Sequence, residues 1–214
     1  LYVPVGAPCN VCLSENPQYA SILKLSGETW EYVAKGVRNS VGFDFHPVTQ
    51  KLFFTDNGRD WLGDDSPSCE LNRVDEEGLF YGFPFEHAIN IKDPEFGDIS
   101  SGYDYVTPIL ELGAHVAPTG IAFYDNHHFP KEFQNNLFIT LHGSWNRSEK
   151  VGYKVVRVTL DQVGEVVTSE DFITGWLQGQ NVLGRPSAPL VTSDGSLLIS
   201  DDKANVIYRI SYTQ

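Results

Sequence analysis

Four aspartates crowd one short loop of this sequence, where their carboxylates could support a bound cation. They are Asp56, Asp60, Asp64 and Asp65. Hard cations such as Ca²⁺ prefer oxygen ligands of this kind. The four do not follow the alternate-residue spacing of an EF-hand loop, so they do not predict direct ligation of that type. The pair Asn57-Gly58 in the same loop is also typical of a simple turn.

A compact group of aromatic and polar side chains could line a pocket for a small molecule. It consists of Trp145, Asn146 and Arg147. The indole offers a flat apolar face, and the other two side chains supply hydrogen bonds. Elsewhere, His87 and the pair His127-His128 are interpreted as loop residues without a chemical role.

The three cysteines, Cys9, Cys12 and Cys69, are one short of a four-cysteine zinc site. Covalent haem attachment requires a histidine after the second cysteine of a C-x-x-C pair, and here Leu13 follows Cys12. A disulfide between two of the three cysteines and plain buried thiols both remain open as interpretations.

The composition is that of a globular chain that is long enough to bury a core. Its 214 residues are 41 % hydrophobic and 20 % charged. Fifteen basic and twenty-eight acidic side chains give a net charge of -13, which argues against nucleic acid or an anionic membrane as partner. A neutral small substrate or a cation fits better. The chain contains no Met and begins inside a strand-like run, so we expect it to be a fragment with further chain upstream.

Short β-like runs punctuated by Gly, Pro, Asn and Asp predict an all-β protein. One unit recurs: an apolar strand, a turn, a second apolar strand beginning with Leu, and then an outer strand. The three copies begin at residues 41, 120 and 188, with second strands at 52–56, 137–141 and 197–201. The segments 1–5 and 21–25 resemble the second half of a fourth unit, which makes about three and a half units.

Repetition of a four-stranded unit is typical of β-propeller blades. We therefore expect residues 1–214 to form a partial propeller. Three and a half blades would leave unpaired strand edges, so we expect the remaining blades to come from upstream chain. An open sandwich is the alternative architecture. The long loop 83–108 interrupts the blades, and function often lies in such insertions.

Short motifs spread in order along nearly the whole chain resemble the quinoprotein glucose/sorbosone dehydrogenase family, most closely its sorbosone and soluble aldose sugar dehydrogenase branch. The motifs are Gly36-Val37-Arg38-Asn39, residues 55–65, Glu70-Leu71-Asn72, Tyr81-Gly82-Phe83-Pro84, residues 115–120, residues 142–148, Gly152-Tyr153-Lys154 and Gly184-Arg185-Pro186. The resemblance implies a six-bladed propeller, of which this chain would be the C-terminal half.

The resemblance also implies an activity. Members of the family bind pyrroloquinoline quinone (PQQ) together with Ca²⁺ and oxidise aldoses or related carbonyl sugars to a lactone or acid. A base takes the hydroxyl proton, hydride passes to the quinone, and the cation stabilises the charge that develops there. Electrons then go to an external acceptor such as a quinone or a cytochrome. A periplasmic or extracellular location is expected from the same resemblance.

Site residues follow position by position from the family. The implied cofactor contacts are Arg38, Asn39, His115, His142, Arg147 and Arg185. The implied metal ligands are the backbone carbonyls of Gly58 and Arg59, which suit a hard cation. If the resemblance is set aside, Arg38 would be interpreted as a salt-bridge residue, and His115 and His142 as histidines whose hydrogen bonds serve only the fold.

The sequence departs from the glucose branch at several of these positions. That branch has Lys at 142, Thr at 115, Trp at 113 and Arg at 187, while this chain has His142, His115, Gly113 and Ser187; Cys69 also stands where an Asp is expected. The family's general base, a histidine, is expected upstream, so the prediction of an enzyme applies to the intact protein. A non-catalytic propeller serving as a binding or scaffolding module is the alternative. A lactone-hydrolysing propeller would need a set of carboxylate and amide ligands that we do not find.

Overall fold

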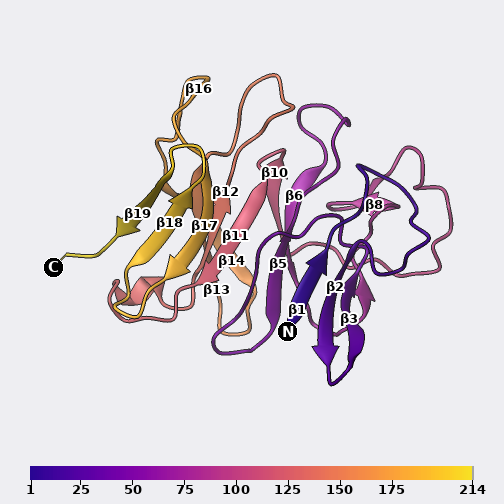
Figure 1. Ribbon diagram of the computed structural model, residues 1–214, viewed down its shortest axis with the longest axis horizontal. Helices are drawn as coiled ribbons and strands as arrows, with labels where there is room; N and C mark the ends of the chain where they lie inside the picture. The colour runs from indigo at the N-terminus through magenta and orange to yellow at the C-terminus, as the bar shows by residue number, and fades with distance from the viewer. Residues whose placement is uncertain (214) are drawn as a thin grey trace.

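The computed structural model describes residues 1–213, and β-strands account for all of the regular structure there except one short 3-10 helix, Lys131–Phe133. The strands form three four-stranded sheets, one three-stranded sheet and two small ribbons. The four larger sheets follow one another along the chain, from the N-terminal sheet to the C-terminal one (Figure 1). The prediction of an all-β protein is confirmed. Within the same residues, no helix combines the length and the apolar character needed to cross a membrane.

The three predicted repeats correspond to the second, third and fourth sheets. The second sheet contains β4 (Phe43–Phe45), β5 (Leu52–Asp56), β6 (Ser68–Arg73) and β10 (Leu110–Ala114). The third contains β11 (Pro118–Phe123), β12 (Leu137–Leu141), β13 (Lys154–Leu160) and β14 (Val166–Ile173). The fourth contains β17 (Pro186–Val191), β18 (Leu197–Asp201) and β19 (Val206–Ile210). The two ribbons pair β8 (Glu86–His87) with β9 (Ile91–Lys92), and β15 (Leu177–Gln178) with β16 (Asn181–Val182).

The first sheet contains more strands than the two segments, 1–5 and 21–25, that the sequence indicated. The first sheet has four strands: β1 (Tyr2–Val5), β2 (Ser21–Ser26), β3 (Thr29–Lys35) and β7 (Leu79–Phe80). The prediction missed β3 because its first half is exposed and does not show an apolar run. It missed β7 because this strand arrives from a later part of the chain and pairs with β3 in parallel.

The core lies between successive sheets, because the middle strands are buried on both faces. All five residues of β5 and of β12 are buried. Side chains alternate along a strand, so Phe54 packs toward the first sheet while Phe53 packs toward the third. In the same way Ile139 joins the cluster shared with the second sheet, and Phe138 joins the one shared with the fourth.

The first strands of neighbouring sheets approach one another closely at two glycines. A Cβ atom on Gly42 would lie 2.9 Å from the Cα atom of Gly120. A Cβ atom on Gly120 would lie 2.7 Å from Pro189 Cδ. Because glycine alone leaves this space, β4, β11 and β17 converge, and the loops at their ends come together as well.

Candidate functional site

The predicted site residues gather at one edge of the sheets because of a repeated hairpin. In each of three sheets, the first strand and the second strand are antiparallel neighbours: β4 with β5, β11 with β12, and β17 with β18. The start of the first strand therefore lies beside the end of the second. Arg38, His115 and Arg185 precede first strands, while Asn57 and His142 follow second strands.

A small cavity of about 180 Å³ at this edge brings four of the predicted residues together. The predicted residues in its lining are Arg38, Asn39, Gly58 and His115. Asn57, Asp60, Cys69, Ala117, Trp145 and Asn146 complete it. Residues separated by more than a hundred positions in sequence therefore meet in one polar cavity.

Arg38 is held by backbone carbonyls rather than by a carboxylate. Its Nη1 donates to the carbonyls of Asn57 and Gly58, both at 3.0 Å. Its Nε donates to Asn10 O at 2.9 Å and its Nη2 to Asn10 Oδ1 at 3.0 Å. The nearest carboxylate oxygen is Asp60 Oδ2, 3.8 Å from Nη2. Four of the five N–H groups of the guanidinium are thereby used, which fixes its position and leaves one for a ligand.

Asp56, at the end of β5, positions the loop that carries Arg38. Its carboxylate accepts hydrogen bonds from the backbone N–H groups of Arg38 at 2.7 Å and Asn39 at 2.6 Å. Burial raises the pKa of Asp56 to about 6 despite these bonds. Asp201 has the corresponding place at the end of β18, where its Oδ1 accepts from the backbone N–H of Arg185 at 2.9 Å.

Glu70 on β6 is buried directly opposite Asp56 in the antiparallel register. Burial, and next the charge of Asp56, raise the pKa of Glu70 to about 8. Its two oxygens accept from Asn72 Nδ2 at 2.9 Å and from the backbone N–H of Ala88 at 2.7 Å. The pair beneath the cavity therefore retains a proton at neutral pH.

His115 is buried, and its ring is tied to the acidic loop. The Nε2 atom lies 2.7 Å from the carbonyl oxygen of Gly63, so Nε2 must carry the proton. The Nδ1 atom is left as a possible acceptor when the ring is neutral. His115 also has a positive φ of 62°, a conformation that places the loop before β11 against the cavity.

Arg59 anchors the predicted metal loop from the other side. Its Nη1 pairs with the wholly buried carboxylate of Asp93, which also lies 2.9 Å from His87 Nε2. Burial alone would raise the pKa of Asp93, but hydrogen bonds from His87 and Arg59 hold it at about 2. The interpretation of His87 as a loop residue is wrong, because it is buried in β8 and bonded to this carboxylate. His127 and His128 do lie in an exposed loop, as predicted.

The predicted calcium ligands fit a cation poorly as they stand. The carbonyl of Gly58 already accepts a hydrogen bond from the Arg38 guanidinium, and two cations cannot share it without repulsion. Residues 1–213 contain no cluster of three or more His, Cys, Asp or Glu that could hold a metal ion. The Arg59 carbonyl accepts no hydrogen bond from these residues.

The lining suits a single anionic or carbonyl group of a planar quinone better than a cation. Arg38 supplies positive charge and a remaining N–H, and Asn39 and His115 add polar groups. Asn146 Oδ1 is buried without a hydrogen-bond partner among the described residues, so it can accept a hydrogen bond from a ligand. Asn146 is held in place by its Nδ2, which donates to Asp60 Oδ1 at 2.6 Å.

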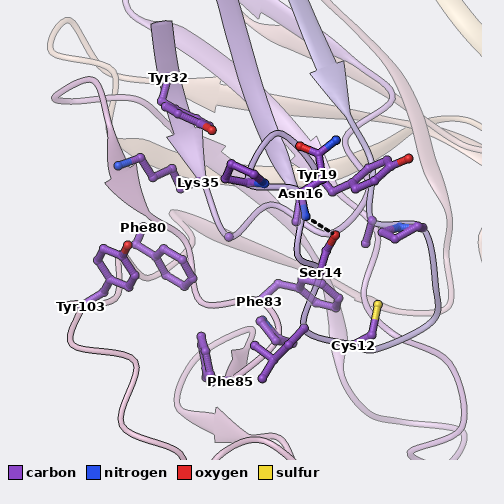
Figure 2. Close-up of a pocket in the computed structure, with 17 residues that line it drawn as sticks. Cys12, Ser14, Asn16, Tyr19, Tyr32, Lys35, Phe80, Phe83, Phe85 and Tyr103 are labelled. Atoms are coloured by element: carbon purple, nitrogen blue, oxygen red, sulfur yellow. Dashed lines mark hydrogen bonds between the residues drawn. The ribbon is translucent and has the colours of Figure 1, made fainter.

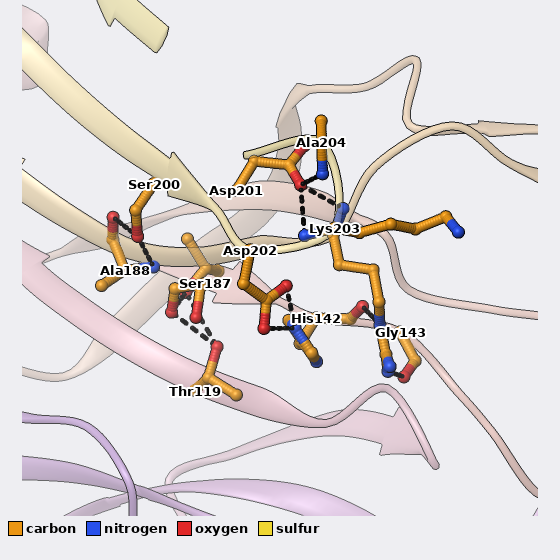
Figure 3. Close-up of polar contacts among 12 residues, drawn as sticks. Thr119, His142, Gly143, Ser187, Ala188, Ser200, Asp201, Asp202, Lys203 and Ala204 are labelled. Atoms are coloured by element: carbon orange, nitrogen blue, oxygen red, sulfur yellow. Dashed lines mark hydrogen bonds and ion pairs between the residues drawn. The ribbon is translucent and has the colours of Figure 1, made fainter. Parts of the chain in front are cut away.

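The other three predicted contacts lie outside this cavity. His142 Nε2 lies 2.9 Å from Asp202 Oδ1 (Figure 3). Arg185 donates to the carbonyls of His142 at 3.1 Å and Gly143 at 2.6 Å. Arg147 donates to Asp64 O at 2.8 Å and to Asp65 Oδ1 at 2.5 Å. One loop, 142–147, thus links the cavity to both of these polar clusters.

Sequence reasoning missed Asn10 and Trp61. Asn10 lies between Cys9 and Cys12, which form a disulfide with Cα atoms 6.2 Å apart, and it carries two of the four Arg38 bonds. The C-x-x-C spacing of Cys9 and Cys12 was the only sequence feature that pointed to Asn10. Trp61 makes an edge-to-face pair with Trp145 at 5.8 Å, and both rings are 68 % exposed. The third cysteine, Cys69, is a buried thiol.

With this geometry established, comparison with known proteins places the chain. A model of TrAA12-like proteins matches residues 75–213. The chain belongs to the TrAA12-like family. An uncharacterised protein of Borreliella burgdorferi is 42 % identical over 217 residues, which cover 99 % of this chain and 57 % of that protein. An uncharacterised Synechocystis protein is 31 % identical over 58 % of this chain and 28 % of its own length.

Solved structures share the fold at low sequence identity. The holo form of the PQQ domain of pyranose dehydrogenase from Coprinopsis cinerea has a TM-score of 0.79 at 21 % identity, covering 99 % of this chain and 66 % of that one. The calcium structure of a Trichoderma reesei family AA12 enzyme has a TM-score of 0.72 at 22 % identity over 96 % and 63 %. The apo soluble aldose sugar dehydrogenase of Escherichia coli has a TM-score of 0.67 at 19 % identity over 95 % and 58 %. The chain spans less than two thirds of the length of these proteins.

Proposed function

We propose that the full-length protein containing this chain is a PQQ-dependent dehydrogenase that oxidises an aldose or sorbosone-type sugar to a lactone or acid. The observation that carries the proposal is the polar cavity that brings Arg38, Asn39 and His115 together at one edge of the sheets. Membership of the TrAA12-like family and the fold shared with a PQQ domain support it.

When bound, PQQ would accept the hydride from the sugar. The protein's part is placement and charge. Arg38, preoriented by four hydrogen bonds, offers its charge and its remaining N–H to a carboxylate or carbonyl. Asn39, whose backbone N–H donates to the Asp56 carboxylate, and His115 are further proposed cofactor contacts in the cavity. Trp61 and Trp145 present exposed rings beside them, which suit the apolar face of a sugar.

Calcium at Gly58 and Arg59 remains part of the proposal, with one condition. A cation bound to the Gly58 carbonyl must displace the Arg38 Nη1–H from it. His142, Arg147 and Arg185 remain predicted cofactor contacts, each of which would have to reorient from its present partners to reach the cavity.

The rest of the site is proposed to come from the remaining polypeptide. We propose six blades in all, with the general base in a blade upstream and membership of the sorbosone branch. β19 supports the need for further strands, because it is the edge of a three-stranded sheet and its Val206 and Ile207 side chains are exposed.

The surroundings of the protein can also be proposed. The Cys9–Cys12 disulfide is consistent with a periplasmic or extracellular location, since disulfides persist in oxidising compartments. The electrons would pass to an external quinone or cytochrome. The net charge of -13 supports the expectation of no nucleic-acid partner.

A second candidate is a propeller that binds without catalysis. It is favoured by the fact that Arg38, Arg147 and Arg185 all donate to backbone carbonyls and so act as ties between loops. In this case the guanidinium groups would serve the fold, and no quinone would bind.

The test is dye-linked oxidation of aldoses and sorbosone-type sugars by the full-length protein, with and without PQQ and Ca²⁺. Turnover that requires PQQ and falls at least tenfold in Arg38→Lys is expected, because lysine cannot reproduce the guanidinium fork. Glu149→Gln is the control, since it changes charge at an exposed position. Absence of both turnover and PQQ binding would overturn the proposal and favour the second candidate.

A further inference from the structure

A second, larger pocket lies on the other side of the disulfide loop from the Arg38 cavity. Its volume is about 320 Å³. Six aromatic rings line it, from Tyr19, Tyr32, Phe80, Phe83, Phe85 and Tyr103 (Figure 2). The sequence named none of them as a site residue, although Phe83, Phe85 and Tyr103 lie in the long loop 83–108, because the six come from β3, β7 and three separate loops.

The aromatic rings are held in place by packing against one another. Phe80 and Tyr103 stack with their planes 4° apart and their centroids 4.5 Å apart. Gly36 makes room for this pair, since a Cβ atom there would lie 2.6 Å from the Phe80 ring. Phe83 is buried, whereas Tyr103 is 52 % exposed. The pocket thus has a buried aromatic floor and an exposed aromatic wall.

Neutral polar groups around the rings keep hydrogen-bonding capacity for a ligand. The hydroxyls of Tyr19, Tyr32 and Tyr103 make no hydrogen bond to another residue of the pocket lining (Figure 2). Ser14 Oγ accepts from the Asn16 backbone N–H at 3.2 Å and keeps its own proton to donate. The rim therefore offers several groups that can both donate and accept.

The charge of the lining limits the ligand. No Asp or Glu lines the pocket, although the chain has twenty-eight acidic residues. Lys35 is the one charged residue there, and its Nζ lies 5.1 Å from the centroid of the Tyr32 ring. A metal ion would find no carboxylate ligand, and a phosphate would find one ammonium group only.

We infer that this pocket binds a saccharide, at a site separate from the Arg38 cavity. The C–H face of a sugar ring carries slight positive charge and packs on the negative face of an aromatic ring, while its hydroxyls bond at the edges. Tyrosine supplies both properties in one side chain. The volume lies at the lower end for small-molecule sites, about 300–1,000 Å³, and suits a short saccharide.

The disulfide loop is the wall between the two sites. Cys12, Ser14 and Asn16 face the aromatic pocket. On the opposite side Asn10 bonds Arg38, and its Oδ1 accepts from the Asp60 backbone N–H at 2.8 Å. Saccharide binding at the aromatic pocket needs neither PQQ nor the oxidation proposed above, so it can be tested without them.

The experiment uses the full-length protein without added PQQ. Binding of cellotriose and maltotriose is measured by calorimetry and by saturation-transfer NMR. Binding of at least one trisaccharide is expected, weakened about tenfold in Tyr103→Ala and in Tyr19→Ala through loss of ring contacts. Tyr103→Phe, which keeps the ring, is expected to lose less. Trp30→Ala is the control. Trp30 is an aromatic residue of β3 that lies outside the pocket and is 43 % exposed, so this variant should bind saccharide as the unaltered protein does.

Three results would overturn the inference. One is that neither trisaccharide binds while the circular dichroism spectrum shows a folded protein. Another is that binding occurs but is unchanged in both alanine variants. The third is that Tyr19 and Tyr103 resist nitration in the full-length protein, which would show that other polypeptide covers the pocket. Because Arg38→Lys should leave saccharide binding intact, failure here is distinguishable from failure of the proposed oxidation.

Discussion

Glu70 lies buried opposite Asp56 beneath the polar cavity, and replacing it by glutamine should make the protein more stable in alkaline solution. The folded protein holds the Glu70 proton up to a pH of about 8, whereas an unfolded chain releases it near 4.5. Between these values the unfolded state binds fewer protons than the folded state. The free energy of unfolding therefore falls as pH rises through this window.

The size of the effect follows from the same two values. The difference between 4.5 and about 8 corresponds to on the order of 5 kcal/mol, at about 1.4 kcal/mol for each tenfold change in proton affinity. Glutamine has the same shape and no charge to desolvate. Its oxygen can accept from the Ala88 N–H, and its NH₂ can donate to Asn72 Oδ1, which is buried without a partner, once the Asn72 amide turns over.

Urea unfolding of the full-length protein and Glu70→Gln at pH 5, 7 and 9 tests this reasoning. The unaltered protein should lose stability between pH 5 and 9, and the variant should lose much less. Glu149→Gln should follow the unaltered protein, because Glu149 is exposed. If Glu70→Gln is as unstable at pH 9 as the unaltered protein, or if the unaltered protein shows no decline, Glu70 is not a protonated buried acid.

Three further changes have defined outcomes. Asp56→Asn removes one acceptor for the two N–H groups of the loop before β4, so unfolding should become easier by about 1–3 kcal/mol in a urea titration. Gly120→Ala should cost a similar 1–3 kcal/mol, because its Cβ would press on the β17 backbone at 2.8 Å; an unchanged midpoint would contradict this close approach. Changing Cys9 and Cys12 together to Ser should release the loop that carries Asn10 and weaken PQQ binding, measured by fluorescence titration, without abolishing the circular dichroism signal of the sheets.

The sequence alone was enough for the first three strands of the second, third and fourth sheets, but it did not predict β10 or β14. Residues 52–56, 137–141 and 197–201 are apolar runs that end at turns, and they became β5, β12 and β18. These middle strands are buried between sheets, so hydrophobicity and strand position coincide. Arg38, Asn39, Gly58 and His115, which a family resemblance named as site residues, do line one cavity, while their role in binding a cofactor stays a prediction.

Other features depended on contacts that local sequence does not encode. β7 joins the first sheet from more than forty residues away, and β3 is half exposed, so neither had an apolar run to reveal it. Three of the four hydrogen-bond acceptors around Arg38 are backbone carbonyls, which every residue possesses and which no motif can mark. The same holds for the aromatic pocket, whose rings come from distant loops.

Sequence by itself determined which residues are apolar, which are charged, and where strands can begin and end, because these follow from side-chain chemistry and from the spacing of apolar residues along the chain. Tertiary structure decided which backbone carbonyls bind the Arg38 guanidinium, that the buried pair Asp56 and Glu70 keeps a proton, and which aromatic rings face one another. Those properties depend on distance and burial between segments far apart in the chain, and only the packed sheets set them.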